Sequence, residues 1–337
     1  MKSNLIRVPT LGMSREEWLA ERRNAIGGSD AAAIIGLNFY SSPYSVWADK
    51  TGRLPEKPDN EAMRQGRDLE EYVAYRWREA TGKKTHRINA ILYNPDIPFA
   101  HANVDRWVKG ENAGLECKTT SIMNLKKFKG GEFPENYYVQ CVHYMAVTGA
   151  ERWYLAVLVL NKGFYHFTIE RDEEEISALL QQEREFWELV KNDTPPSVDG
   201  FNATTDALKT IYCGGGDEVE LFGRAELFDR YEELTAQKSE VDSEIEKIKQ
   251  QLMSDLGESE GAYCGEWKVS WKRQTRKTFD ADAFRRANPH TAIEQYYKFS
   301  ANRVMRITKI QKKSEDTRLK HCNLSTIPKK GAQTQAP

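Results

Sequence analysis

Three residues whose types and spacing could do chemistry together are Asp105, Glu116 and Lys118: ten residues separate the two acids, and one residue separates Glu116 from Lys118. Side chains alternate along a strand, so Glu116 and Lys118 share one face. If a strand at 100–108 pairs with a strand at 114–119 as a hairpin, Asp105 comes beside Glu116. Two carboxylates at one spot repel each other unless a divalent cation neutralises them, and magnesium or manganese suits such oxygen ligands. With a lysine to orient or deprotonate water, the pattern predicts metal-assisted phosphodiester hydrolysis.

The same spacing occurs a second time, at Asp255, Glu266 and Lys268, so spacing alone is weak evidence for a catalytic site. In this second copy the aspartate falls near the end of a polar helix, and a glycine-rich turn separates the two acids. We therefore expect the first copy to converge on one spot and the second not to. A surface ion pair on a strand is the alternative interpretation of the pattern.

Other residues around the first copy could complete a site. Glu70 lies in a predicted helix ahead of the strands and could bring a third carboxylate, while Gln140 lies in the following helix and could hold a water molecule or a phosphate. Arg22 and Ser29 flank a glycine turn at a helix start, where backbone N–H groups and the helix dipole favour a phosphate. Each has a plainer alternative: Glu70 as a solvated acid, Gln140 as an amide at the edge of the core, and Ser29 as a helix N-cap.

The elements that must position these residues follow from periodicity and from helix start and stop signals. Ser14 and Glu17 predict a capping box that opens a helix, which should end near a glycine pair. A short apolar helix at 31–35 follows, capped by Ser29 or Asp30. The other predicted elements are a helix at 59–80, strands at 90–93, 100–108 and 114–119, a helix at 135–147, a hairpin of 152–160 with 164–170, and a helix at 172–191. Their order predicts an α/β fold with a central mixed sheet flanked by helices.

Acidic and basic residues are distributed unevenly along the chain. Residues 217–260 carry 14 acids against 5 bases, whereas residues 267–337 carry 17 bases against 5 acids. The expected segments are a catalytic domain at 1–200, a linker at 201–216, a long acidic helix with a small basic α+β region at 217–308, and a disordered basic tail at 309–337.

The long helix is expected at 221–256, where apolar residues recur in a nearly heptad stripe typical of a coiled coil. Its acids would repel DNA, so we interpret it as a spacer or an oligomer contact, and less as a docking site for a partner protein. The basic residues that follow are interleaved with Trp267 and Trp271, which suits either a nucleic-acid-binding strand or a plain amphipathic strand.

Composition excludes several classes of protein. The 337 residues are 39% hydrophobic and 29% charged, a globular mixture. The longest apolar run, 153–160, is far shorter than the roughly 20 residues that cross a bilayer, and the polar N-terminus lacks the apolar core of a signal peptide. Five scattered cysteines without a C-x-x-C pair signal neither a disulfide framework, a structural zinc site nor an iron–sulfur cluster. We therefore expect a cytoplasmic protein with no membrane contact.

Five ordered motifs carry a family resemblance across roughly residues 14–200. They are 18–23 with 26–30, 66–70, Asp105, 116–118 and 138–140. In this order they resemble the YqaJ-type phage recombination nucleases, relatives of the lambda exonuclease in the PD-(D/E)XK nuclease superfamily. The resemblance implies that Asp105, Glu116 and the main-chain carbonyl of Cys117 hold Mg²⁺ or Mn²⁺, with two ions per site. It also implies that Glu70 helps to hold the second ion and that Lys118 positions or activates the attacking water.

The resemblance further implies that Gln140 orients water or substrate and that Arg22 with Ser29 holds the 5′-terminal phosphate of DNA. The family degrades one strand of linear double-stranded DNA from its 5′ end and leaves a 3′ single strand for an annealing recombinase. This places the protein in the cytosol of a bacterial host, encoded by a phage or prophage, and suggests a ring-shaped trimer by analogy. Two departures are Val142, where relatives often have a second glutamine, and the extension after about Asp217.

Two alternatives stay open. One is a restriction or repair endonuclease of the same fold, which would cut closed circular DNA. The other is a scaffold that binds DNA ends without cutting, although the intact set of Asp105, Glu116 and Lys118 speaks against it.

Overall fold

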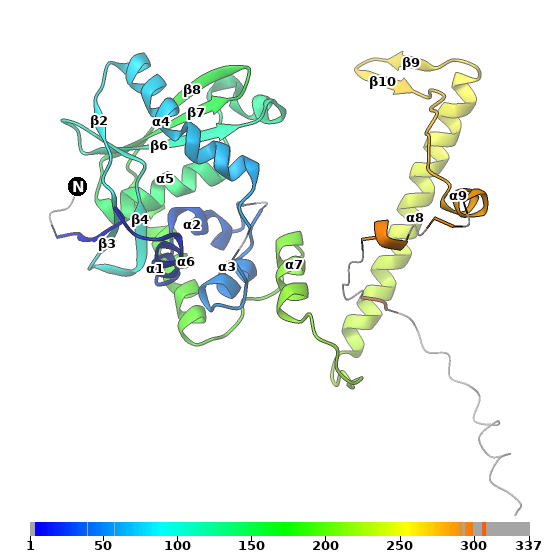
Figure 1. Cartoon of the computed structure of the whole chain (residues 1–337), viewed down its shortest axis with the longest axis horizontal. Coiled ribbons are helices and arrows are strands. Elements are labelled where there is room, and N and C mark those ends of the chain that lie inside the picture. The colour runs from blue at the N-terminus through cyan, green and yellow to red at the C-terminus, as the bar shows by residue number, and fades with distance from the viewer. Residues whose placement is uncertain are drawn as a thin grey trace, which may run out of the picture. The chain divides into compact units, whose positions relative to one another are not determined.

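The computed structural model describes residues 4–307 apart from 39, 57, 289, 292–293 and 299–304. Its elements are traced in Figure 1. The chain divides into two compact units, the first reaching Cys213 and the second spanning Gly214–Ala301. The predicted tail at 309–337 lies outside the described residues.

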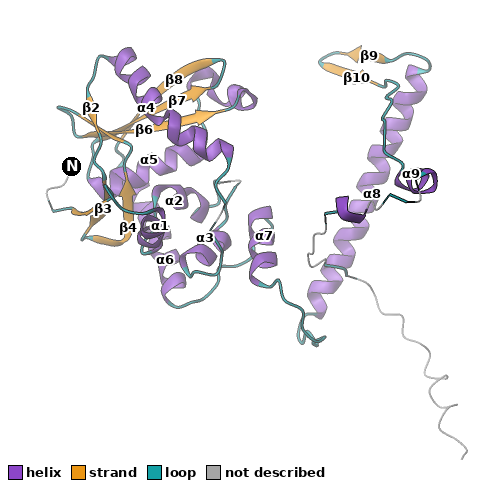
Figure 2. Cartoon of the chain, viewed as in Figure 1, coloured by secondary structure: helices purple, strands orange, loops and turns teal. Residues whose placement is uncertain are grey.

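A five-stranded mixed sheet forms the centre of the first unit, in the order β2-β5-β6-β7-β8. β6 and β7 run parallel, and the other neighbouring pairs run antiparallel. The strands are β2 (Thr85–His86), β5 (Arg106–Val108), β6 (Ala113–Thr120), β7 (Arg152–Val159) and β8 (Gly163–Glu170). Helices lie on both sides of the strands (Figure 2), so the predicted α/β fold with a mixed sheet flanked by helices is confirmed.

The alternation of side chains along β7 separates the core into two layers. Tyr154 points to one face of the sheet, where Trp77 of α4 (Glu61–Thr81) packs against it. Trp153 points to the other face, which α5 (Glu135–Thr148) covers. The two helices that were expected to carry Glu70 and Gln140 therefore approach the sheet from opposite sides.

Two features of the sequence set these layers. Asn60 caps α4 by accepting a hydrogen bond of 2.9 Å from the Met63 backbone N–H, and Gly82 ends it with a φ of +71°. On β6, a Cβ atom at Gly114 would lie 2.3 Å from the ring of Trp153. Any side chain at this position would therefore collide with the buried ring of Trp153.

The N-terminal helices differ from the prediction in their ends. The capping box of Ser14 and Glu17 opens α1 (Arg15–Arg23), but this helix stops before the glycine pair. Neither Ser29 nor Asp30 is the N-cap of α2 (Gly28–Ile34). Gly27 takes that place, and Asp30 in the first turn accepts a 3.0 Å hydrogen bond from its N–H. The prediction was wrong because the helix begins at Gly28, ahead of both residues, so that Asp30 lies at its third position and accepts from the N–H of the N-cap residue.

One helix, α3 (Pro43–Lys50), was not predicted. Ser42 caps it with a 3.1 Å hydrogen bond from the Ser45 N–H, and proline occupies its first position. A serine followed by proline is a helix start signal that the sequence contained.

The predicted strand at 100–108 is broken in two. Its first part belongs to β4 (Ile97–Asn103), which pairs with β3 (Ala90–Asn94) in a three-stranded sheet completed by β1 (Ile6–Pro9). Its second part is β5, which pairs with β6 in the five-stranded sheet as expected. Asp105 lies at the break, so its side chain is placed by the change of sheet and not by regular strand alternation.

The rest of the first unit is helical. α6 (Glu173–Lys191) packs against α5, and a 3₁₀ helix, η1 (Ile122–Gly131), follows β6. α7 (Asn202–Ile211) falls within the segment expected as a linker, yet it packs against α3, and the Thr204 hydroxyl lies 2.7 Å from that of Ser42.

The second unit contains the predicted long helix, α8 (Ala225–Leu256), and a β-hairpin. The hairpin pairs β9 (Gly261–Cys264), which was not predicted, with β10 (Trp267–Ser270), and α9 (Ala281–Ala287) and the 3₁₀ turn η2 (Glu294–Tyr296) follow. No helix among the described residues is long and apolar enough to cross a membrane.

Candidate active site

Asp105 lies between the end of β4 and the start of β5, where it contacts β6. The Asp105 carboxylate accepts a hydrogen bond of 2.8 Å from the backbone N–H of Cys117. The antiparallel pairing of β5 with β6 brings about this contact, because it sets Arg106 opposite Leu115. The hairpin expected from the sequence is thus present, and it places Asp105 beside the strand that carries Glu116.

Glu116, Lys118 and Gln140 form one network on the α5 face of the sheet. The Lys118 ammonium lies 2.6 Å from Glu116 Oε1 and donates to Gln140 Oε1 at 2.9 Å. The Gln140 amide nitrogen donates to Glu116 Oε1 at 2.7 Å and to the Tyr144 hydroxyl at 3.0 Å. Lys118 also lies 5.4 Å from the centre of the Tyr137 ring, a cation–π contact. The helix amide therefore fixes both charged strand residues.

The three charged residues are shielded from water to different degrees: Glu116 is only 3% exposed, whereas Asp105 and Lys118 are partly exposed. Burial raises the pKa of Asp105 well above its ordinary value, and the charges of Glu116 and Glu70 raise it further. Burial also raises the pKa of Glu116, although Lys118 opposes this. Burial alone would lower the pKa of Lys118, but Glu116 and Asp105 outweigh it and raise that pKa. Shifts of pKa by burial together with neighbouring charges are typical of catalytic centres.

Glu70 approaches from α4 on the opposite face of the sheet, and the buried guanidinium of Arg106 holds its carboxylate in an ion pair. Arg106 also donates a 2.8 Å hydrogen bond to Glu71. Glu70 is still close enough for its charge to raise the pKa of both Asp105 and Glu116. The structure therefore brings it to the edge of the site, with its carboxylate bound to an arginine.

The fit of a divalent cation can be judged from the acids themselves. Among the described residues, no three or more His, Cys, Asp or Glu side chains are grouped as a metal site. Glu116 Oε2 is nevertheless buried without a hydrogen-bond partner, and its charge raises the pKa of Asp105. A cation between the two carboxylates would remove both costs. Asp105 and Glu116 thus fit such an ion, whereas Glu70 would first have to leave Arg106.

Arg22 and Ser29 form the second predicted part of the site. The Arg22 guanidinium donates to the Ser29 hydroxyl at 3.0 Å and lies 4.6 Å from the ring centre of Trp18. Between them, Gly28 lies against α5: a Cβ atom there would be 2.9 Å from Gln140 and 2.7 Å from Tyr144. This glycine lets the Arg22–Ser29 pair approach the Gln140 network.

Two contributors were missed in the sequence. Arg106 directly follows Asp105, and the alternation of β5 sends its side chain to the α4 face, where it meets Glu70. Tyr144 lies four residues after Gln140 and hence on the same face of α5. Both positions could have been found by applying helix and strand periodicity to the neighbours of the predicted residues.

Among solved structures, an alkaline exonuclease from Laribacter hongkongensis is 21% identical, with a TM-score of 0.46, and the match covers 53% of this chain and 93% of that chain. A phage-related exonuclease from Haemophilus somnus 129PT is 12% identical, with a TM-score of 0.39, over 50% of this chain and 96% of that chain. The Laribacter protein has also been solved in complex with dAMP.

Sequence comparison identifies the family. Residues 17–151 match the YqaJ-like viral recombinase domain, a segment that contains every residue of the site described above. The uncharacterized protein YqaJ of Bacillus subtilis (strain 168) is 40% identical over 267 residues, which cover 77% of this chain and 84% of that protein. The resemblance noted in the sequence is therefore confirmed, and the chain belongs to the YqaJ-like viral recombinase family.

Proposed function

We propose that this chain is a Mg²⁺-dependent nuclease that degrades one strand of linear double-stranded DNA from its 5′ end. The observation that carries the proposal is the group of Asp105, buried Glu116 and partly exposed Lys118, in which Gln140 holds Glu116 and Lys118 on one face of the sheet. Two mutually repelling carboxylates next to a lysine suit a phosphodiester and a divalent cation better than any reaction without a metal. Membership of a viral recombinase family agrees with a DNA substrate.

The metal would be held by Asp105 and Glu116, together with the main-chain carbonyl of Cys117. Bound there, Mg²⁺ would polarise the phosphate and make a coordinated water more acidic, and a second ion would stabilise the leaving oxygen. Glu70 would help with the second ion after exchanging its contact with Arg106. Mn²⁺ suits the same oxygen ligands.

The chain's own residues supply positioning and charge. Lys118 places a positive charge beside the carboxylates, where it can orient water and stabilise charge on the phosphate. Gln140 accepts a hydrogen bond from Lys118 and donates one to Glu116, so it fixes the positions of both side chains and can orient water or substrate near them. Arg22, supported by Ser29, would bind the 5′-terminal phosphate through charge-assisted hydrogen bonds.

The proposed product is a duplex with a 3′ single-stranded overhang, which suits strand annealing. A single-strand annealing recombinase in the cytosol of the bacterial host would be its partner. These steps belong to phage-type recombination and follow from the family rather than from a contact in the structure.

The test follows linear duplex DNA that carries a 5′ phosphate at one end only, with each strand labelled in turn. Reactions contain Mg²⁺, EDTA, or Mg²⁺ with the Lys118→Ala variant. We expect Mg²⁺-dependent loss of the phosphorylated strand from its 5′ end, absent in the variant. Cutting of closed circular DNA would instead indicate an endonuclease, and DNA-end binding without cleavage under any metal would indicate a scaffold.

A further inference from the structure

The β9–β10 hairpin of the second unit has two faces of different chemistry. Lys268 lies directly opposite Tyr263 in the register, so these two side chains share one face. Side chains alternate along a strand, so Trp267 and Trp271 point to the other face. The N–H of Trp271 continues the pairing of the strands, because it donates a 2.9 Å hydrogen bond to the Glu260 carbonyl. We call the side of the hairpin that carries the two tryptophans the Trp face.

The indole rings of the Trp face are open to solvent. Trp267 is 79% exposed and Trp271 is 49% exposed. The residues of β9 on this face, Ala262 and Cys264, are small, so no bulky side chain of that strand lies between the two rings. An amphipathic strand, the alternative expected from the sequence, would bury this face, and the described part of the chain does not bury it.

The chain that carries the two indoles is also strongly basic. Residues 267–279 contain five cations and no acid. The cations are Lys268, Lys272, Arg273, Arg276 and Lys277. Lys272 lies 3.9 Å from Glu260, whereas among the described residues no ion pair involves Arg273, Arg276 or Lys277, which are all exposed. Unpaired cations gathered in so short a segment attract a polyanion.

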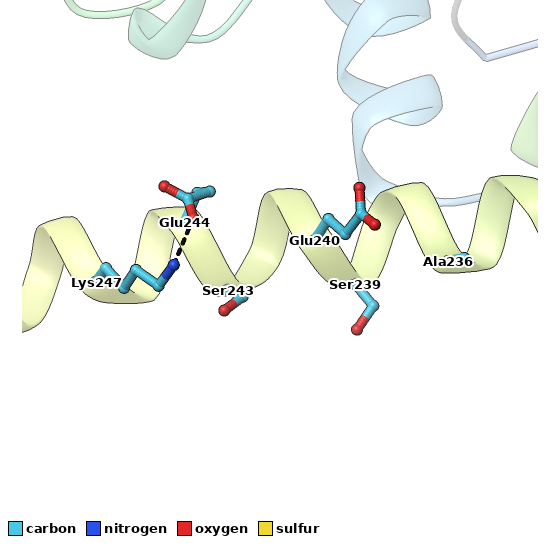
Figure 3. A pocket seen from close by; sticks show the side chains of 6 residues that line it. All are labelled: Ala236, Ser239, Glu240, Ser243, Glu244 and Lys247. Atoms are coloured by element: carbon cyan, nitrogen blue, oxygen red, sulfur yellow. Dashed lines mark hydrogen bonds and ion pairs between the residues drawn. The ribbon is translucent and has the colours of Figure 1, made fainter.

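The long helix of the same unit has the opposite character. Figure 3 shows a hollow along α8, lined by Ala236, Ser239, Glu240, Ser243, Glu244 and Lys247. The one cation among these residues, Lys247, is paired with Glu244 at 2.6 Å. The hollow therefore offers a polyanion two carboxylates and no unpaired cation. The Trp face and the basic segment after it suit a polyanion, and this side of α8 does not.

We propose that the Trp face of the hairpin, together with the basic segment at 272–277, binds single-stranded DNA without sequence preference. Exposed aromatic rings stack on unpaired bases, while cations beside them hold the phosphates. A duplex offers the same phosphates but keeps its bases stacked inside, so the indoles favour a single strand. The binding itself is independent of the nuclease chemistry. Only the identity of the bound strand, as the 3′ overhang that the nuclease leaves, rests on the proposed function.

The first test measures binding by the full chain in EDTA, where no cleavage is needed, by fluorescence anisotropy. The probe is a ligated circle of single-stranded DNA, because a strand without ends cannot occupy a site for a 5′ terminus. We expect this circle to bind at least about tenfold more tightly than a closed circular duplex of the same length, from the stacking of one or more bases. Equal affinities for the two circles, or no binding of the single-stranded circle, would overturn the proposal.

The second test compares the two faces of one strand. Trp267→Ala should weaken binding of the single-stranded circle by about tenfold, the loss of one stacked base. Trp267→Phe keeps an aromatic ring and should restore most of the affinity, which separates stacking from a loss of the hairpin. Lys268→Ala, on the other face, is the matched control and should stay within about twofold of the wild type. If Trp267→Ala binds as well as the wild type, or loses no more than Lys268→Ala, the Trp face does not bind DNA and the proposal is wrong.

The third test examines the basic segment through the salt dependence of binding. For single strands, each phosphate that a cation neutralises adds about 0.7 to the slope of log affinity against log salt. The double variant Arg276→Ala with Lys277→Ala should therefore lower this slope by about 1.4, whereas Lys247→Ala on α8 should leave it unchanged. An unchanged slope in the double variant would contradict the proposal.

Binding of the circle and cleavage of linear duplex DNA are separate measurements, so their failures can be told apart. A chain that cleaves linear duplex DNA but does not bind the single-stranded circle refutes the DNA-binding Trp face alone. A chain that binds the circle through Trp267 but cleaves no DNA supports the Trp face and refutes the nuclease.

Discussion

One spacing pattern occurs twice in this chain: an aspartate, then a glutamate eleven positions later, then a lysine two positions after that. The two copies differ in how far they are exposed to solvent. The copy that begins at Asp105 converges in a partly buried network on the α5 side of the sheet. The copy that begins at Asp255 has its aspartate on an exposed turn of α8, where it accepts a hydrogen bond from Gln251, and its glutamate, Glu266, in the exposed turn between β9 and β10.

The difference shows that the pairing of the strands, and not the spacing in the sequence, brings the three side chains together. In the first copy β5 pairs with β6, so that the carboxylate of Asp105 meets the backbone of Cys117. In the second copy β10 pairs with β9, and Asp255 belongs to neither strand. Lys268 therefore faces Tyr263 across the hairpin, 5.3 Å from its ring centre, and solvent instead of a carboxylate pair.

The largest expected effect on the cleavage rate is a difference between the lysines of the two copies. Lys118→Ala should lower the cleavage rate of linear duplex DNA by about 100-fold to 10,000-fold, because the charge next to the reacting phosphate is lost. Lys268→Ala should keep the rate within about twofold of the wild type at saturating DNA, because its side chain is exposed and outside the site. Single-turnover kinetics measure both rates.

A measurement of DNA binding shows whether Lys118 acts on the cleavage step or on the affinity for DNA. Lys118→Ala should bind a DNA end nearly as well as the wild type in EDTA, as measured by fluorescence anisotropy. Equal cleavage rates for the two lysine variants would contradict the assignment of the site to the first copy.

The sequence predicted the elements that local signals define. The capping box at Ser14, the stripe of α4 and the pairing of β5 with β6 all follow from periodicity and from side-chain hydrogen bonds within a few residues. It did not predict the break at Asp105, because both halves of that segment can form a strand and only their pairing with two different sheets divides them. Strand periodicity can place Arg106 on the α4 face of the sheet, but it does not show that its guanidinium holds Glu70, which lies 36 residues away in the chain.

A smaller effect should distinguish two neighbouring arginines of α1. Arg22→Ala should reduce the preference for 5′-phosphorylated over dephosphorylated ends by about tenfold, the loss of one charge-assisted contact of about 1.4 kcal/mol. Arg23, which pairs with Asp49 at 3.5 Å, provides the matched control, and Arg23→Ala should keep the preference. If Arg22→Ala slows both kinds of end equally, the phosphate role is wrong.

Mg²⁺ should raise the thermal stability of the protein, and this rise should depend on the acids of the first copy and not on those of the second. Mg²⁺ at about tenfold over its dissociation constant should raise the free energy of unfolding of the wild type by about 1.4 kcal/mol, measured as a rise in melting temperature over EDTA. Asp105→Asn removes one of the two carboxylates and should abolish most of this rise, whereas Asp255→Asn should keep it. A full rise in Asp105→Asn would show that the ion binds elsewhere.

The smallest effect is a pH dependence with a definite sign. A carboxyl whose pKa is higher in the folded than in the unfolded state holds its proton more tightly when folded, so its contribution to stability falls as pH rises above the unfolded value. Asp105 and Glu116 are both of this kind. In EDTA, Asp105→Asn should therefore gain stability over the wild type between pH 5 and pH 8, by roughly 1 kcal/mol. Asn keeps an oxygen for the Cys117 N–H, so the change isolates the charge. A stability difference that stays constant over this range would show that burial and the neighbouring acids do not raise the pKa of Asp105 in the folded protein.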